Sequence, residues 1–241
     1  MGVLNYGIIN NIISMDESAD KLLNCFILFG LGLLVLAISY LLGSLSSAII
    51  VSRLMFNEDV RSHGSGNAGL TNMLRTYGKG AAAITLIGDM LKTAVAILIT
   101  AIVFGFNYNN GICLSGMCYL SGLCAVLGHV FPIFYGFKGG KGVLVTATMA
   151  LILTPVIFLS LLIIFITVVV ITGFVSLGSI VVAAFFPITV CLYSYFIGGA
   201  LPTLTALCTI FLGLFVIWCH RANIKRLRDG NEKRISIGKR D

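Results

Sequence analysis

The chain has 241 residues, of which 58% are hydrophobic and only 10% charged, with a formal net charge of +7 and a mean hydropathy of +1.04. Soluble domains carry about 25% charged residues, so the composition excludes an ordinary soluble enzyme and leaves no room for a nucleic-acid-binding domain. An outer-membrane barrel is excluded because barrel strands alternate apolar and polar residues over about 10 positions. We expect an all-α, polytopic membrane protein built from long apolar helices.

The amino-terminal segment, residues 1–21, precedes the first apolar run and is interpreted as an extension of the membrane domain. It lacks the positive n-region of a signal peptide, and Tyr6 stands where a myristoylation signal needs Ser or Thr. Acidic residues dominate this side of the first apolar run, whereas Arg53, Arg61 and Arg75 follow it. The positive-inside rule therefore predicts an external amino terminus and a cytoplasmic first loop.

The apolar runs predict about seven membrane spans, which begin and end near residues 22–50, 81–104, 117–134, 142–154, 155–173, 179–196 and 203–219. The basic tail, residues 221–241, should be cytoplasmic, where it can also touch anionic membrane lipid. A single helix over residues 142–173 would leave this tail outside. Because proline disfavours helix at the residue before it, Pro155 is expected to divide that run into two short spans.

Three clusters of glycine and basic residues interrupt the apolar runs. They are GSGNAGLTNMLR (Gly64–Arg75), GHVFPIFYGFKGGKG (Gly128–Gly142) and HRANIKRLRDGNEKR (His220–Arg234). Glycine lets backbone N–H groups approach a ligand closely, and Arg and Lys add fixed positive charge. The predicted topology brings all three to the cytoplasmic face. The pattern therefore predicts one cytoplasmic-facing site for phosphate groups.

The first cluster opens with small and amide residues that can form a nest of backbone N–H groups around a phosphate. An ordinary flexible loop is the alternative, but Arg75 and Lys79 follow it and favour anion binding. The ending of a Walker A loop is absent. In the second cluster, Lys138 and Lys141 surround a Gly-Gly pair. Snorkelling lysines that fix topology are the alternative there, yet they do not require the two glycines.

Isolated titratable residues lie in or beside the spans. Asp89 and Lys92 are three positions apart on one helix, and because intramembrane charges are costly, a mutual ion pair is predicted. His129 lies near the inner end of a span, where it either packs or acts as a base. His220 opens the basic tail, with Asn223 on the same helical face.

Other kinds of active site find little support in the sequence. No Ser-His-Asp order or zinc-ligand spacing is present, and the HxxxxD signature of many acyl-CoA-dependent acyltransferases is missing. We expect no metal and no cofactor. Cys113 and Cys118 lie near a predicted outer loop; free thiols are expected there, with a disulfide as the alternative.

Five segments between about Tyr40 and Arg234 occur in the order found in one family: LLGSLSSAIIVSRL, VRSHGSGNAGLTNMLRTYGKG, GHVFPIFYGFKGGKGV, FVSLGSI and HRANIKRLRDGNEKR. They resemble the bacterial membrane glycerol-3-phosphate acyltransferases that use acyl phosphate as donor. The resemblance implies a seven-helix enzyme of the bacterial cytoplasmic membrane, with residues 22–220 as its acyltransferase domain. The chain departs from the family at Leu70, where alanine is usual, and this departure leaves the fine substrate specificity open.

The implied reaction transfers a fatty acyl group from acyl phosphate to sn-glycerol 3-phosphate, giving 1-acylglycerol 3-phosphate (lysophosphatidate) and inorganic phosphate for phospholipid synthesis. The implied partners are these substrates, membrane lipid and a soluble enzyme that makes acyl phosphate. A transporter or flippase for a phosphorylated metabolite is the alternative function. The sequence shows no internal repeat, however, and its clusters lie at one surface rather than at the midplane.

The clusters and the resemblance together predict the site residues. The candidates for catalysis are Ser65, Arg75, His129, Lys141 and His220. The candidates for substrate and phosphate binding are Gly64, Gly66, Asn67, Thr71, Asn72, Lys138, Gly139, Gly140, Ser176 and Asn223. Either His129 or an oxygen of a substrate phosphate is expected to take the proton of the acceptor hydroxyl. Glu232, in the tail motif, is expected to have a structural role.

Overall fold

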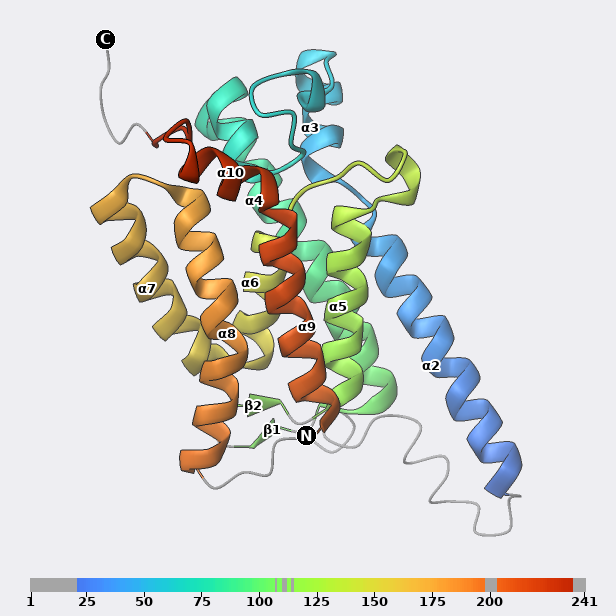
Figure 1. Ribbon diagram of the computed structural model, residues 1–241. Coiled ribbons are helices and arrows are strands. Elements are labelled where there is room, and N and C mark those ends of the chain that lie inside the picture. Colours follow the sequence, from blue (N-terminus) through green and yellow to red (C-terminus); the bar gives the residue numbers. More distant parts are fainter. Residues whose placement is uncertain (1–20, 107, 110–111, 114, 198–202, 236–241) are drawn as a thin grey trace.

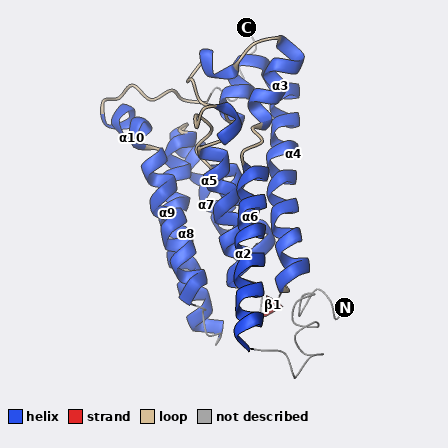
Figure 2. Cartoon of the chain, turned by 90° about the vertical axis from the view of Figure 1, so that its right-hand side faces the viewer, coloured by secondary structure: helices blue, strands red, loops and turns tan. Residues whose placement is uncertain are grey.

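The computed structural model describes residues 21–106, 108–109, 112–113, 115–197 and 203–235, which form a bundle of helices (Figures 1 and 2). Its helices are α2 (Lys21–Gly43), α3 (Ser47–Phe56), α4 (Leu70–Phe104), α5 (Gly116–Val130), α6 (Val143–Leu153), α7 (Pro155–Thr172), α8 (Val175–Ile197), α9 (Thr203–Cys219) and α10 (Arg221–Arg228). Two 3-10 turns, η1 (Val60–Ser62) and η2 (Ile133–Tyr135), lie in the connections. The helical fold class is confirmed.

One small β-hairpin departs from the all-helical expectation. Strand β1 (Tyr108–Asn109) pairs antiparallel with β2 (Ile112–Cys113) in the predicted outer loop. Cys113 and Cys118 are free thiols, as expected. The predicted amino-terminal extension lies outside the described residues except for its last member, Lys21, and the basic tail is described only as far as Ile235.

Within the described residues, five helical segments are long and apolar enough to cross a membrane, and a sixth qualifies if α9 and α10, bent by 54°, count as one span. The predicted break at Pro155 is confirmed, since α6 ends at Leu153 and α7 begins at the proline. The 11 residues of α6 extend about 16 Å, whereas a hydrocarbon core is about 30 Å thick. The multi-pass architecture is therefore confirmed, and the count of seven spans stays a prediction.

The second span begins earlier than its hydropathy indicates. Helix α4 starts at Leu70 rather than near Ala81, and it is kinked at Gly78, whose φ of 83° and ψ of −171° are non-helical. Such a backbone conformation is nearly restricted to glycine. The kink separates a short first segment, which carries Thr71, Asn72 and Arg75, from the long apolar part of the helix.

All three glycine-basic clusters lie at one end of the bundle. In Figure 1, α3, the loop after α5, the α7–α8 turn and α10 are at the top, while the start of α2 and the hairpin are at the bottom. Figure 2 shows the same separation from the side. This confirms that the clusters converge on one end; which side of the membrane this end faces stays a prediction.

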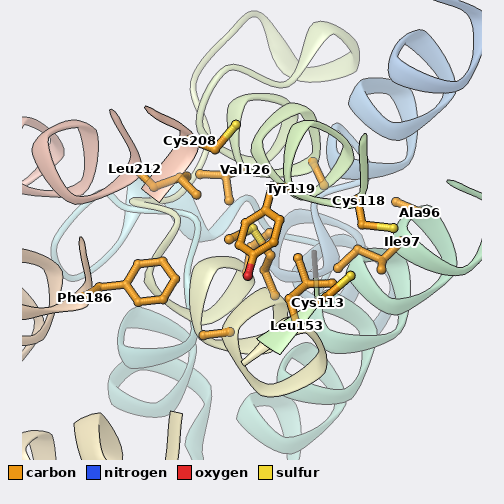
Figure 3. Packing of buried hydrophobic residues seen from close by; sticks show 14 of the residues in the cluster. Ala96, Ile97, Cys113, Cys118, Tyr119, Val126, Leu153, Phe186, Cys208 and Leu212 are labelled. Carbon is orange, nitrogen blue, oxygen red and sulfur yellow. The ribbon is translucent and has the colours of Figure 1, made fainter. Parts of the chain in front are cut away.

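The core at the centre of the bundle combines apolar packing with close helix contacts. Tyr119 lies among buried residues of several helices, with Phe186 and Leu212 on its α8–α9 side (Figure 3). Helices α2 and α5 approach so closely that a methyl group on Gly43 or Gly128 would collide with the backbone of the other helix. Small residues at such contacts are the usual way in which membrane helices pack.

Candidate functional site

A single cavity of about 690 Å³ connects the clusters with the interior of the bundle. We call its polar end the mouth, formed by the following residues: Ser65, Asn67, Thr71, Asn72, Arg75, Lys141, Ser176, His220, Asn223, Arg226 and Glu232. We call its apolar part the groove, formed by the following residues: Phe158, Leu161, Leu162, Phe165, Val182, Ala183, Phe186 and Leu212. The cavity therefore suits a molecule with one anionic end and one long apolar end.

Most of the predicted site residues line this cavity. They are Gly64, Ser65, Asn67, Thr71, Asn72, Arg75, His129, Lys141, Ser176, His220 and Asn223. The predicted residues that do not line it are Gly66, Lys138, Gly139 and Gly140. Lys138 is exposed, so the two lysines of the second cluster have different surroundings although they are three positions apart.

A chain of hydrogen bonds joins the second and third clusters at the mouth. Lys141 Nζ donates to Asn223 Oδ1 at 2.6 Å, and Asn223 Nδ2 donates to Glu232 Oε1 at 2.7 Å. Ser176 Oγ donates to the same carboxylate oxygen at 2.7 Å, and Arg226 Nε lies 2.7 Å from the other oxygen. The side-chain amide of Asn223 is oriented by a cation on one side and an anion on the other. These contacts support the structural role expected for Glu232, which stays a prediction.

The mouth carries an excess of positive charge. Burial lowers the pKa of Lys141, and the charges of Arg226 and Arg75 lower it further, while Glu232 and Cys219 oppose this change. Arg75 lines the cavity and makes no ion pair within the described part of the chain. A bound phosphate would relieve the repulsion between these cations.

Asn72 organises the first cluster from within. Its Oδ1 accepts from the Ser65 N–H at 2.8 Å, and its Nδ2 donates to the carbonyl oxygens of Val60 and His63 at 3.1 and 3.0 Å. Gly64 has a φ of +61°, and a methyl group there would collide with Asn72 Oδ1. Both Nδ2 hydrogens of Asn72 and one lone pair of its Oδ1 therefore hold the loop.

The predicted backbone nest is not formed by Ser65 and Gly66, because the N–H of Ser65 bonds to Asn72 and that of Gly66 to the carbonyl of His63 at 3.0 Å. The start of α4 provides a different anion-binding feature. Its N-cap, Gly69, has no side chain to cap the first N–H groups, and Leu70 and Thr71 line the cavity. The positive end of the helix dipole therefore faces the mouth, close to Arg75.

The two glycines of the second cluster pack against the end of α5. Gly139 N–H donates to Val130 O and Gly140 N–H to His129 O, both at 3.1 Å. A methyl group on Gly139 would collide with the His129 carbonyl, and one on Gly140 with the His129 ring. Both glycines are needed to seat the loop that presents Lys141 against the end of α5.

Arg61 does not line the cavity but joins the first two clusters, a role that the sequence did not predict. Its Nη1 donates to the carbonyl oxygens of Tyr135 and Lys138 at 2.7 and 3.1 Å, and its Nη2 pairs with Asp59 at 2.8 Å. The hydrogen bonds that Arg61 and Arg53 donate to Asp59 hold the pKa of this carboxyl group well below its usual range, although burial acts in the opposite direction. The only sequence signal was a basic residue next to the first cluster.

Three buried titratable groups within the bundle form a triad. Lys92 Nζ lies 2.8 Å from Asp89 Oδ1, which confirms the predicted ion pair, and 3.1 Å from His129 Nδ1. Asp89 and His129 both line the cavity. His220, at the start of α10, differs: its Nδ1 lies 2.7 Å from the carbonyl oxygen of Val216. Since a carbonyl only accepts, His220 carries its hydrogen on Nδ1, and within the described residues the Nε2 lone pair is free.

Residues 33–230 match the family model described as glycerol-3-phosphate acyltransferase. The chain belongs to this family. A relative named glycerol-3-phosphate acyltransferase from Clostridioides difficile (strain 630) is 42% identical over 203 residues, which cover 84% of this chain and 95% of the relative. A relative of the same name from Bacillus subtilis (strain 168) is 38% identical over 202 residues, which cover 84% of this chain and 96% of the relative.

Solved structures of the family are also similar to this chain. The crystal structure of PlsY (YgiH), an integral membrane glycerol 3-phosphate acyltransferase, in its glycerol 3-phosphate form matches with a TM-score of 0.73 and 32% identity, covering 85% of this chain and 96% of that chain. Its lysophosphatidic acid form matches with a TM-score of 0.71 and 31% identity, covering 85% and 95%. The resemblance inferred from the sequence motifs is confirmed at the level of the family.

Proposed function

We propose that this member of the glycerol-3-phosphate acyltransferase family uses acyl phosphate as its donor and sn-glycerol 3-phosphate as its acceptor. The products would be lysophosphatidate and inorganic phosphate, made for bacterial phospholipid synthesis. The observation that carries the proposal is the continuity of a cationic mouth with an apolar groove in one cavity of about 690 Å³. Acyl phosphate has the matching form, with a phosphate at one end of a long apolar chain.

Phosphate recognition is assigned to the cations of the mouth and to the start of α4. Arg75 and Lys141 offset the charge of the two substrate phosphates, and the N-terminus of α4 adds backbone donors. Ser65, Asn67 and Thr71 line the same part of the cavity and orient the hydroxyl and phosphate oxygens of the acceptor.

The chemistry requires little beyond positioning, because acyl phosphate is an activated mixed anhydride. The acceptor hydroxyl oxygen attacks the acyl carbon, the bond between that carbon and the phosphate oxygen breaks, and phosphate leaves with the electron pair. The free Nε2 lone pair of His220 accepts the hydroxyl proton and passes it to the departing phosphate. Asn223 acts beside it by holding the Lys141 ammonium in place.

We also propose that the mouth faces the cytoplasm of a bacterium, with the chain embedded in the cytoplasmic membrane. Basic residues gather at the end of the bundle where α10 lies, in support of this orientation. A soluble enzyme that makes acyl phosphate would then deliver the donor from the same side. A cysteine in place of the exposed Lys138 should react with a membrane-impermeant maleimide only after cells are opened; labelling in intact cells contradicts this orientation.

The first test separates acyl transfer from transport. Purified protein in detergent, supplied with labelled glycerol 3-phosphate and palmitoyl phosphate, is expected to form labelled lysophosphatidate. The same protein in sealed vesicles without donor is expected to carry no label across the membrane. Label that accumulates in the vesicles while no lipid forms in detergent contradicts the proposal and supports a transporter.

A further inference from the structure

The hydrogen-bonding state of His129 is fixed by Lys92. The Lys92 ammonium, paired with Asp89 Oδ1 at 2.8 Å, also donates to the carbonyl oxygen of Leu45 at 2.8 Å and lies 3.1 Å from His129 Nδ1. An ammonium has three hydrogens to donate and no lone pair. Its third hydrogen therefore points to His129, and Nδ1 of that ring is the acceptor.

The ring of His129 is consequently neutral, with its hydrogen on Nε2. The side chains of Asp89 and Lys92 are 1% and 4% exposed, and their charges offset each other. A second cation beside them, within the membrane-spanning part of the bundle, would remain uncompensated, and such charges are costly. With Nδ1 engaged and Nε2 protonated, His129 has no free lone pair. It is a hydrogen-bond donor, not the base considered for it from the sequence.

The Nε2 donor of His129 is not used by the protein itself. His129 lines the cavity, and in the described part of the chain Nε2 has no hydrogen-bond partner. Gly140 lies directly beside it, and a methyl group at that position would collide with Nε2. The missing side chain therefore keeps the N–H unobstructed.

His129 also lies where the two parts of the cavity meet. On one side it contacts Gly140, the residue before Lys141 of the mouth. On the other side, Val126, about one turn before His129 on α5, belongs to the same buried cluster as Leu161, Phe186 and Leu212, which line the groove. A donor with its phosphate in the mouth and its chain in the groove has its acyl carbonyl at this junction.

We propose that His129 is a further catalytic residue, which donates a hydrogen bond from Nε2 to the acyl carbonyl oxygen, with Asp89 and Lys92 as its positioning residues. The inference rests on the proposed acyl transfer. When the acceptor hydroxyl attacks, the C=O electron pair moves onto this oxygen, and the N–H stabilises the resulting oxyanion. The pair returns as the new ester forms and phosphate leaves. One such donor in a site closed to water contributes on the order of 10²–10³ in kcat.

The test compares two replacements of similar size. The amide of His129→Gln can still donate a hydrogen bond, whereas His129→Met has no donor. With palmitoyl phosphate and glycerol 3-phosphate in detergent, His129→Met is expected to lose on the order of 10²–10³ in kcat, with KM for glycerol 3-phosphate little changed. The kcat of His129→Gln is expected to be roughly tenfold or more higher than that of His129→Met. His63→Gln, on the surface and outside the cavity, should match the wild type.

A second readout does not depend on activity. The chain has 3 histidines, so nitrogen NMR of histidine-labelled protein can be assigned with single variants at His63 and His220. The expected spectrum shows His129 with hydrogen on Nε2 and none on Nδ1. Hydrogen on Nδ1, or equal loss of kcat in folded His129→Gln and His129→Met, overturns the inference. If the wild type makes no lysophosphatidate from any donor, the proposed function fails instead, while the spectrum still tests the state of His129.

Discussion

At the mouth of the cavity, Lys141, Asn223 and Glu232 are joined side chain to side chain at 2.6 and 2.7 Å, whereas the groove is lined mainly by aromatic and aliphatic side chains with no directional contact between them. The mouth depends on the identity and orientation of single polar groups. The groove depends on volume alone. Single substitutions should therefore cause large losses of rate at the mouth and graded changes of substrate preference in the groove.

The largest effect is expected at the mouth, where a positively charged side chain is proposed to bind phosphate. Lys141→Met removes a cation that is half-buried at the mouth and held by Asn223, and kcat/KM for glycerol 3-phosphate should fall on the order of 10²–10³-fold. Lys138→Met is the matched control, because this lysine is exposed and outside the cavity. Steady-state kinetics in detergent measure both. Equal losses in the two variants would remove the distinction between the lysines.

A smaller, graded effect is expected in the groove. Ala183 is buried and lines the cavity, while its neighbour Ala184 is exposed on the outer face of α8. Ala183→Leu should shorten the groove and lower kcat/KM for palmitoyl phosphate about tenfold relative to a short-chain acyl phosphate. Ala184→Leu should leave the preference unchanged. A chain-length series of donors provides the measurement, and an unchanged profile in Ala183→Leu contradicts the assignment of the acyl chain to the groove.

A substitution of Glu232 tests whether the polar network at the mouth stabilises the folded protein. Burial alone would raise the pKa of Glu232, but hydrogen bonds from Ser176, Asn223 and Arg226 outweigh it and lower the pKa. The charged form therefore stabilises the fold above the ordinary pKa of about 4.3, and this contribution is lost as the pH falls through the lower folded value. Glu232→Gln should cost about 1–3 kcal/mol near pH 7.

Thermal unfolding in detergent at several pH values gives the readout for Glu232. The difference in Tm between the wild type and Glu232→Gln should be full at pH 7 and shrink below about pH 4. Asp229→Asn, at an exposed position in the same tail, is the control and should change Tm little. A Tm difference that becomes larger as the pH falls would mean that the Glu232 carboxylate does not stabilise the fold through its charge.

The smallest effect is expected at Arg61, which joins the first two clusters by hydrogen bonds. Arg61→Met removes the bonds to the carbonyl oxygens of Tyr135 and Lys138 and the pair with Asp59. Because Arg61 and Asp59 are partly exposed, the pair contributes about 1 kcal/mol or less, and KM for glycerol 3-phosphate should rise by about fivefold or less. Arg228→Met, which is exposed and outside the cavity, provides the baseline. A loss as large as that of Lys141→Met would place Arg61 in the mouth itself.

The sequence predicted those features that local physics decides. Hydropathy and charge brought the three clusters to one end of the bundle, and the geometry before a proline predicted the break at Pro155. The cost of isolated charge in a membrane predicted the pair of Asp89 and Lys92. The break and the ion pair depend on residues within a few turns of one another, and the convergence of the clusters depends only on how many spans separate them.

The features that the sequence did not predict depend on contacts between distant parts of the chain. His129 joins the triad from 37 positions away, and Arg61 reaches a carbonyl 74 positions away. Nothing in the composition of FKGGKG distinguishes Lys141, which faces the cavity, from Lys138, which does not. The contacts of the two glycines with the end of α5 were not predicted for the same reason, and their role in substrate binding stays a prediction.

The central claim is that one cavity accepts a phosphate in its mouth and an acyl chain in its groove, so that acyl phosphate is the donor. The most direct measurement supplies the purified protein with labelled glycerol 3-phosphate and either palmitoyl phosphate or palmitoyl-CoA. Labelled lysophosphatidate that forms only from palmitoyl phosphate is the predicted result. Lysophosphatidate formed from palmitoyl-CoA alone would contradict the account of the donor while leaving the acyltransferase family assignment intact.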